Sequence, residues 1–196
     1  PILAGLGLLS VAVALGAQDL FKNLISGILI LLEKRFPNGD WIKVENIVEG
    51  VVEKIGFLST LIRRFDSSPV MVPNFNFAEN AVTNFSNMKS RRIYWTIGLE
   101  YRTTHDQLRI IRDQIEEYIS SSGDFVKSSE QPLFVRLEKF SDSSIDILIY
   151  CFATTTVWGE WLKIKEELAL KIKSIVEENN AGFAFPSQSI YVEKNT

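Results

Sequence analysis

The chain opens with a long apolar stretch and continues with a mixed, charged remainder. Residues 1–32 carry two charged side chains, Asp19 and Lys22, and the first eighteen residues carry none. One helix over this stretch would be about 48 Å long, at ~1.5 Å per residue. That length exceeds the ~30 Å hydrocarbon core of a bilayer, so the helix could span a membrane and then bend along its surface.

Three interpretations of this stretch differ in what the helix does. A cleaved signal peptide would need a basic segment at its start, whereas the opening residues are uncharged, and the apolar pattern resumes after Lys22. A lipid-facing anchor is typically rich in Leu, Ile, Val and Phe, but small residues crowd this helix. A ring of pore-lining helices would use small residues to bring identical neighbours close together.

Small residues recur at helical spacing. They form two stripes: Ala4, Ala12 and Gly16, with Leu8 between them, and Gly7, Ser10 and Ala14. Packing, and not hydrophobicity, drives helix association in lipid, so two such faces could meet between identical neighbours. A plain anchor gains nothing from this pattern.

One helix face has the chemistry of a pore constriction. Val11 and Leu15 are four residues apart and share this face, which Gln18 and Lys22 continue. Closely packed copies would project Val11 and Leu15 as two apolar rings, and a narrow apolar ring can stop ions by dewetting. Asp19 and Lys22 need water or a partner at membrane depth, which a pore mouth offers.

After the turn signal Pro-Asn-Gly-Asp at 37–40, the pattern changes to short β-type runs. These runs are rich in Val, Ile, Thr and Phe and cover residues 41–44, 46–57, 59–65, 69–74 and 80–86. They predict a small barrel-like β domain, which we place at residues 36–90.

The remainder predicts an α/β sandwich of the split βαβ type over residues 91–187. Strands are expected at 91–101, 133–140 and 144–154, and amphipathic helices at 104–122 and 158–178. The inner edge of the second helix is expected to run through Leu162, Lys165/Glu166, Ala169 and Ile172. A last short strand is expected at 189–194.

Composition narrows the function classes. The chain is 46% hydrophobic and carries 24 acidic and 21 basic side chains, so electrostatics do not favour a nucleic-acid partner. One cysteine, Cys151, and one histidine, His105, exclude an internal disulfide and a Cys/His zinc site. We expect Cys151 to pack in a core and His105 to be exposed at a helix start. The sequence predicts no enzyme, no cofactor and no metal site.

Five segments carry a family resemblance. They are VALGAQDLFKNLISGILILLEKRFPNGDWI, VMVPNFNFAENAVTNFS, SDSSIDILIYCF, TTTVWGEWL and FAFPSQSIYV. The first is the most specific, because a small-residue helix with Ala-Gln, Asn and Gly at set spacings runs into Phe-x-x-Gly-Asp-Trp-Ile. Over nearly its whole length the chain resembles the bacterial mechanosensitive channel of small conductance (MscS) family.

The resemblance implies a membrane protein of the α+β class. Residues 1–35 would form a bent, pore-lining transmembrane helix, and residues 36–90 a small β-barrel-like (Sm-like) domain. Residues 91–187 would form a ferredoxin-like α/β sandwich, and the strand in 188–196 would join copies into an intersubunit parallel β-barrel. Copies would assemble as a homoheptamer, with further membrane helices preceding Pro1.

The function implied is a channel that membrane tension opens during hypo-osmotic shock. It would lie in the bacterial inner membrane, in contact with the lipid bilayer, and release ions and small osmolytes. Residues from about 36 onward would lie in the cytoplasm. Val11 and Leu15 match the two constriction rings of the family, where leucine is common at both, so Val11 would make its ring slightly wider.

The helix departs from the family pattern at its bend. The family often bends at a glycine directly after the position of Gln18, where this chain has Asp19. We therefore expect the bend to shift, with Asn23 and Gly27 as candidates. Residues expected to act in bending or packing are Ala4, Gly7, Ala12, Gly16, Asp19, Asn23 and Gly27. The alternative function is a membrane-anchored cytoplasmic interaction module without conduction.

Overall fold

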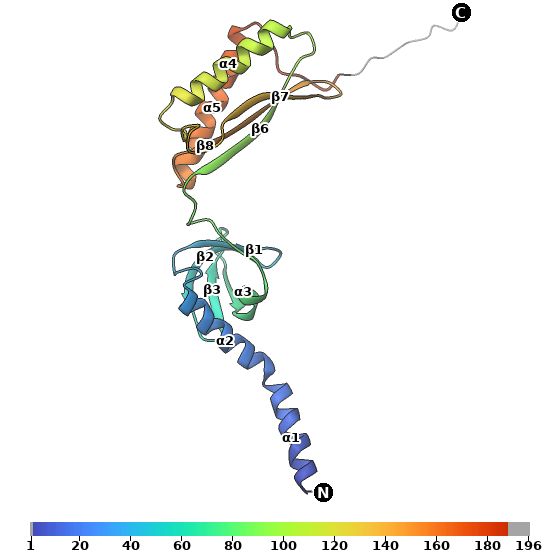
Figure 1. Ribbon diagram of the computed structural model, residues 1–196, viewed down its shortest axis with the longest axis vertical. Helices are drawn as coiled ribbons and strands as arrows, with labels where there is room; N and C mark the ends of the chain where they lie inside the picture. The colour runs from blue at the N-terminus through green and yellow to red at the C-terminus, as the bar shows by residue number, and fades with distance from the viewer. Residues whose placement is uncertain (1, 188–196) are drawn as a thin grey trace, which may run out of the picture. The chain divides into compact units, whose positions relative to one another are not determined.

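A computed structural model describes residues 2–187 of the chain, with the backbone alone for residues 2–6, 8 and 9. The strand predicted at 189–194 therefore lies outside the described residues. The chain divides into two compact units between Met88 and Lys89, and each unit is described by itself (Figure 1).

The first unit begins with two helices, α1 (Ile2–Gly16) and α2 (Gln18–Glu33). Among the described residues, neither helix alone is long and apolar enough to cross a bilayer. Ser10–Gly16 and α2 meet the length and composition requirements together, with a 51° bend between them. The bend falls at Ala17, so the expected shift to Asn23 or Gly27 is wrong. The helix breaks where the uniformly apolar α1 meets α2, one face of which packs on the β domain.

A five-stranded antiparallel sheet follows, and all five predicted runs contribute a strand. The strands are β1 (Trp41–Val44), β2 (Val48–Ile55), β3 (Ser59–Arg63), β4 (Pro69–Pro73) and β5 (Val82–Asn84), in the order β4-β3-β2-β1-β5. A short helix, α3 (Phe75–Glu79), which the sequence pattern did not predict, connects β4 and β5. Alternate residues of the strands face one apolar core, and Ile30, Phe36 and Phe77 complete it.

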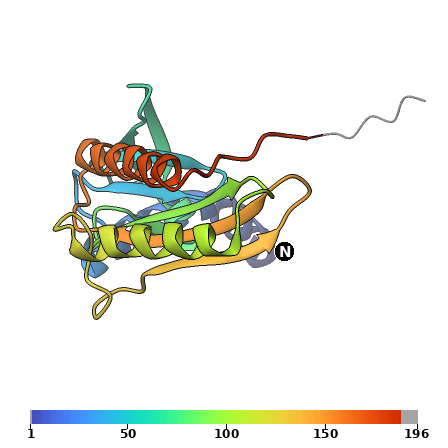
Figure 2. The ribbon, with the colours of Figure 1, turned by 90° about the horizontal axis from the view of Figure 1, so that it is seen from above.

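The second unit has the predicted element order of strand, helix, two strands and helix. The elements are β6 (Arg91–Leu99), α4 (His105–Ser121), β7 (Phe134–Phe140), β8 (Ile145–Ala153) and α5 (Trp158–Glu178). The antiparallel sheet has the order β6-β8-β7, and both helices run along its strands (Figure 2). After α5 the chain returns to the edge of β6, where Phe183 bridges Leu99.

The core of this unit lies between the sheet and the two helices. Ile111, Ile115 and Ile119 of α4 pack on it at helical spacing, and the Thr104–Gln107 capping box fixes the start of that helix. The inner face of α5 consists of Leu168, Ile172, Ile175 and Val176. The expected inner positions of Leu162 and Ala169 are wrong, because both side chains are exposed, whereas Ile172 is buried as expected.

The β7–β8 turn is organised by the carboxylate of Asp146. It accepts hydrogen bonds from Ser141 Oγ and Ser144 Oγ, both at 2.6 Å. These bonds favour the charged form and hold the pKa of Asp146 below its ordinary value. Gly98 lies opposite Asp146 in β6, and a Cβ there would approach the Ser144 Cβ to 2.8 Å. The turn therefore needs glycine at position 98.

We predict that Asp146 makes the stability of the second unit depend on pH in the acid range. Because its folded-state pKa is lowered, its contribution is present above the unfolded-state pKa and is lost as pH falls through the folded-state value, that is, below about pH 4. Asp146→Asn should lower the unfolding free energy at pH 7, and the difference from the unmodified chain should narrow below about pH 4. The measurement is chemical unfolding between pH 7 and pH 2, with Asp142→Asn as the exposed control. An unchanged acid dependence in Asp146→Asn would contradict the assignment.

Candidate pore helix and its attachment to the β domain

The described part of α1 is apolar on every face and exposed within its own chain. Val11 is 56% exposed and Leu15 is 67% exposed. A Cβ added at Gly7 or Gly16 would meet nothing within 4 Å. A helix that is apolar all round is normally covered by lipid or by other protein. This segment therefore has the surface of a helix that packs outside its own subunit.

In contrast, α2 is attached to the β domain along one face. Ser26, Gly27 and Ile30 are its buried residues. Ile30 packs in the same core as Phe36 and Phe77, whose rings lie 5.2 Å apart. The opposite face of α2 keeps Leu20, Phe21, Ile25, Ile28 and Leu32 exposed.

The closest approach is between Gly27 and Asn74, at the end of β4. Asn74 is fully buried, and its Nδ2 donates to the carbonyl oxygens of Gly56 at 2.9 Å and Phe57 at 3.0 Å. Its Oδ1 accepts from Thr60 Oγ1 at 2.8 Å. A Cβ at Gly27 would lie 2.5 Å from Asn74 Nδ2 and 2.6 Å from the Phe57 oxygen. Helix α2 can take this position only with glycine at 27.

A second polar contact lies one turn earlier in α2. Asn23 Oδ1 accepts from the backbone N–H of Phe75 at 3.1 Å, and its Nδ2 donates to the Asp19 oxygen at 2.9 Å. Phe75 is the first residue of α3, so its N–H has no partner within that helix. We call Asn23, Gly27, Asn74 and Phe75 the clasp.

Charged groups flank the clasp. Lys22 Nζ lies 3.8 Å from a Glu79 carboxylate oxygen in α3, and Arg35 donates to the Phe77 oxygen at 3.1 Å. The Lys22 pair is exposed and contributes about 0–1 kcal/mol. The attachment therefore rests mainly on the buried face of α2, where Gly27 lies against Asn74 and Ile30 packs in the core.

The structure separates the residues expected from sequence into two groups. Asn23 and Gly27 belong to the clasp. The other group is exposed at or near the bend and consists of Val11, Ala12, Leu15, Gly16, Gln18 and Asp19. Lys22 is exposed but faces Glu79. The side chain of Ala4 is outside the described part. Sequence analysis did not assign a role to Asn74 or Thr60, although Asn74 lies in the Val-Pro-Asn segment that supports the resemblance.

His105 and Cys151 occupy the positions expected of them. His105 is exposed as the first residue of α4, and Cys151 is buried in β8. Burial raises the pKa of the Cys151 thiol to about 12, so it is almost entirely protonated at neutral pH and a poor nucleophile. Among the described residues, no cluster of three His, Cys, Asp or Glu side chains could hold a metal.

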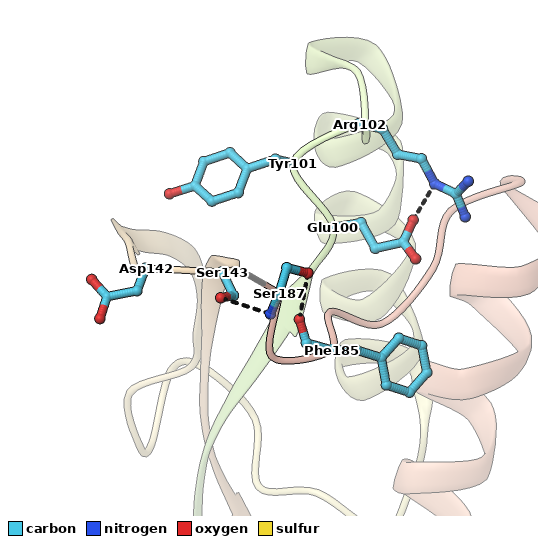
Figure 3. Close-up of a pocket in the computed structure, with 7 residues that line it drawn as sticks. All are labelled: Glu100, Tyr101, Arg102, Asp142, Ser143, Phe185 and Ser187. Carbon is cyan, nitrogen blue, oxygen red and sulfur yellow. Dashed lines mark hydrogen bonds and ion pairs between the residues drawn. The ribbon is translucent and has the colours of Figure 1, made fainter. Parts of the chain in front are cut away.

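A hollow of about 410 Å³ lies near the end of the described chain (Figure 3). Glu100, which lines it, is paired with Arg102, and Ser143 Oγ accepts from the Ser187 N–H at 3.3 Å. These groups already pair with one another.

Comparison with sequence families gives two matches. The β-domain model of the mechanosensitive ion channel matches residues 19–87, and the C-terminal model of the mechanosensitive ion channel MscS matches residues 93–183. Together they cover most of the chain and include the clasp.

Individual proteins similar in sequence to this chain are named as mechanosensitive channels as well. The chain is 38% identical to the low conductance mechanosensitive channel YnaI of Escherichia coli, over 97% of the chain and 55% of that protein. It is 35% identical to the small-conductance mechanosensitive channel MscMJ of Methanocaldococcus jannaschii, over 99% of the chain and 54% of that protein. The chain thus spans about half the length of these relatives.

Solved structures share the fold. The crystal structure of Helicobacter pylori MscS in a closed state aligns with a TM-score of 0.84 and 26% identity, over 99% of this chain and 74% of that one. The cryo-EM structure of Arabidopsis thaliana MSL1 aligns with a TM-score of 0.88 and 25% identity, over 95% of this chain and 66% of that one.

We predict that Gly27→Ala destabilises the first unit. The added methyl group would force Asn74 or the Phe57 backbone to move, and overpacking of this kind costs about 1–3 kcal/mol. Thermal or chemical unfolding of the purified protein measures the change. The matched control is Gly159→Ala in α5, where the new Cβ meets nothing within 4 Å. Equal stabilities of the two variants would mean that the close approach at Gly27 has no energetic consequence.

Proposed function

The chain belongs to the MscS family of mechanosensitive ion channels, and on that basis we propose that the whole protein is a channel opened by membrane tension. The family consists of membrane channels and not of enzymes. The observation that carries the proposal is the pair of family-model matches, which together take in the clasp and both units. The exposed apolar surface of α1 supports it, since that surface requires lipid or neighbouring subunits.

We propose that identical copies surround a central pore, as a homoheptamer. Helix α1 and the first turns of α2 would form the transmembrane and pore-lining part, with Gly7, Ala12 and Gly16 allowing neighbours to approach. The Sm-like β domain, the ferredoxin-like unit and the strand in 188–196 would form a cytoplasmic vestibule beneath the bacterial inner membrane. Ions and small osmolytes would pass through it.

The proposed gate consists of the apolar rings of Leu15 and Val11. A narrow hydrocarbon ring blocks ions because a hydrated charge cannot enter it without losing water. Gln18 would line the pore beyond the gate. Lys22 would lie at the pore mouth, where its exposed contact with Glu79 leaves it in reach of water.

The clasp would hold α2 in place on the β domain while the helix that carries the gate moves. Because α2 is held on the β domain at Asn23 and Gly27, a force that tilts α1 would be resisted beyond the bend at Ala17. We propose that opening changes the angle between α1 and α2 while α2 keeps its place on the β domain.

We predict that the whole protein, with its membrane part intact, runs as a cyclic oligomer. Native mass spectrometry in detergent or lipid nanodiscs should give the mass of seven copies. A monomer or dimer that is silent in patches under tension would instead indicate a membrane-anchored interaction module and would overturn the channel proposal.

We predict that Leu15→Ser raises resting leak and lowers the tension needed for opening, because a hydroxyl group lets water enter the ring. Patch recording under graded suction measures both quantities, and cells that express the variant should grow poorly. The control is Leu29→Ser in α2, which should affect packing more than leak. If Leu29→Ser raised leak and Leu15→Ser did not, the proposed pore face would be wrong.

A further inference from the structure

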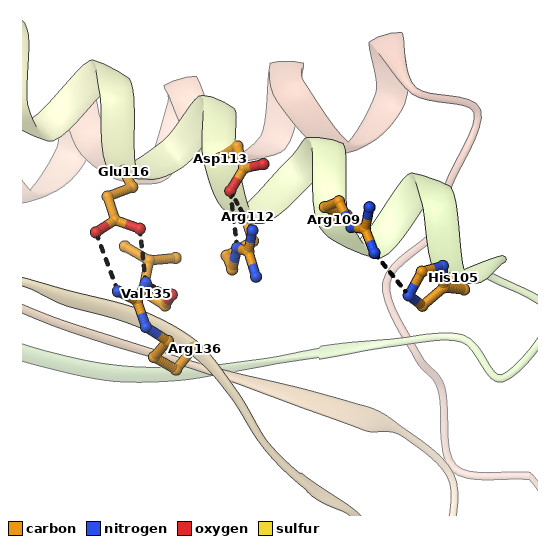
Figure 4. Close-up of polar contacts among 7 residues, drawn as sticks. All are labelled: His105, Arg109, Arg112, Asp113, Glu116, Val135 and Arg136. Carbon is orange, nitrogen blue, oxygen red and sulfur yellow. Dashed lines mark hydrogen bonds and ion pairs between the residues drawn. The ribbon is translucent and has the colours of Figure 1, made fainter.

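A small groove lies between α4 and the edge of the sheet in the second unit. It has a volume of about 220 Å³ and is lined by His105, Leu108, Arg109, Arg112, Leu137 and Ile147. Pockets for drug-sized ligands measure about 300–1,000 Å³, so this groove suits a smaller molecule. Figure 4 shows His105, Arg109 and Arg112 on the side of α4 that faces the strands.

The arginine side chains along the groove differ in whether they form an ion pair with a carboxylate. Arg112 Nε donates to Asp113 Oδ1 at 2.8 Å, and beyond the groove Arg136 donates to Glu116 at 2.6 Å. Arg109 has no carboxylate within ion-pair distance among the described residues. Its described polar partner is His105, whose Nε2 lies 3.3 Å from Arg109 Nη2. Within the part of the chain that the structure describes, Arg109 is therefore a cation at the groove with no carboxylate close enough to pair with it.

The contact with His105 leaves most of the hydrogen-bonding capacity of Arg109 unused. A guanidinium group has five N–H donors and no acceptor, so His105 Nε2 must accept in this contact. The other ring nitrogen, Nδ1, lies 3.3 Å from Asp106 Oδ1. The remaining N–H groups of Arg109 can bind a second acceptor, and a carboxylate matches their planar geometry.

The floor of the groove is apolar. Leu108 comes from α4, and Leu137 and Ile147 come from paired positions of β7 and β8. Leu137 remains 43% exposed, next to the register shift that separates it from Lys139. An exposed leucine beside the Arg109 cation offers contact for both ends of an amphiphilic anion.

We propose that this groove binds a small organic anion, with its carboxylate on Arg109 and a short apolar body on Leu108 and Leu137. The site lies within the second unit and uses no residue of the proposed gate.

The test uses the whole protein in lipid nanodiscs and 6,6,6-trifluorohexanoate as the probe, followed by ¹⁹F NMR. Empty nanodiscs correct for partition of the probe into lipid. Saturable binding is expected, and Arg109→Gln should weaken it about tenfold, the scale of one charge-assisted hydrogen bond. The matched control is Arg92→Gln, an exposed arginine of β6 outside the groove, which should bind as the unmodified protein does.

A neutral probe and a second variant test the proposal in addition to Arg109→Gln. The neutral 6,6,6-trifluorohexan-1-ol should bind at least several-fold more weakly than the anion. Leu137→Gln should weaken binding of the anion even if Arg109→Gln fails to assemble. Absence of saturable binding, equal affinity in Arg109→Gln and the unmodified protein, or equal affinity for the alcohol and the anion would each overturn the proposal.

Discussion

The attachment of α2 to the β domain depends on one close approach, in which the backbone of Gly27 lies against the buried amide of Asn74. The amide is held by three hydrogen bonds, two to the carbonyl oxygens of Gly56 and Phe57 and one from Thr60. A side chain at position 27 would enter the space of Asn74 and the Phe57 backbone. The direction in which α2 leaves the β domain is thus set by a hydrogen-bonded network that tolerates little displacement.

The remaining features of the first unit follow from this attachment. One turn before Gly27, Asn23 binds the first N–H of α3 and holds a second point of α2 in place. Within the described residues, no comparable contact restrains α1. The apolar side chains of α1 from Val11 to Leu15 are exposed. The 51° bend at Ala17 separates a helix that packs on its own β domain from one whose described side chains are exposed. This division favours a gate on α1 that moves relative to a fixed α2.

Local patterns predicted the strands and helices well, because alternation and helical spacing are properties of neighbouring residues. All five runs of the β domain and both long helices of the second unit are present. The short helix α3 was missed because five residues carry little periodicity. The inner face of α5 was misjudged at Leu162, since two apolar stripes compete on that helix and only tertiary packing selects the one through Leu168.

The candidate site was less accessible from sequence. Position 27 was singled out for its glycine, but it was assigned to bending because its partner, Asn74, is distant in the chain. Contacts such as Asn23 with Phe75 depend on how β4 and α3 return to α2, which no local pattern contains. The pore face through Val11 and Leu15 stays a prediction, because the groups that would face it belong to other copies.

Asn23→Ala shows whether the clasp holds α2 while α1 moves. This change removes the contact with the Phe75 N–H and leaves the apolar core and the proposed constriction intact. The measurement is patch recording of the whole protein under graded tension. The proposed hold on α2 predicts an unchanged single-channel conductance with a shifted opening tension. An unchanged opening tension, or a changed conductance at the same tension, would contradict it.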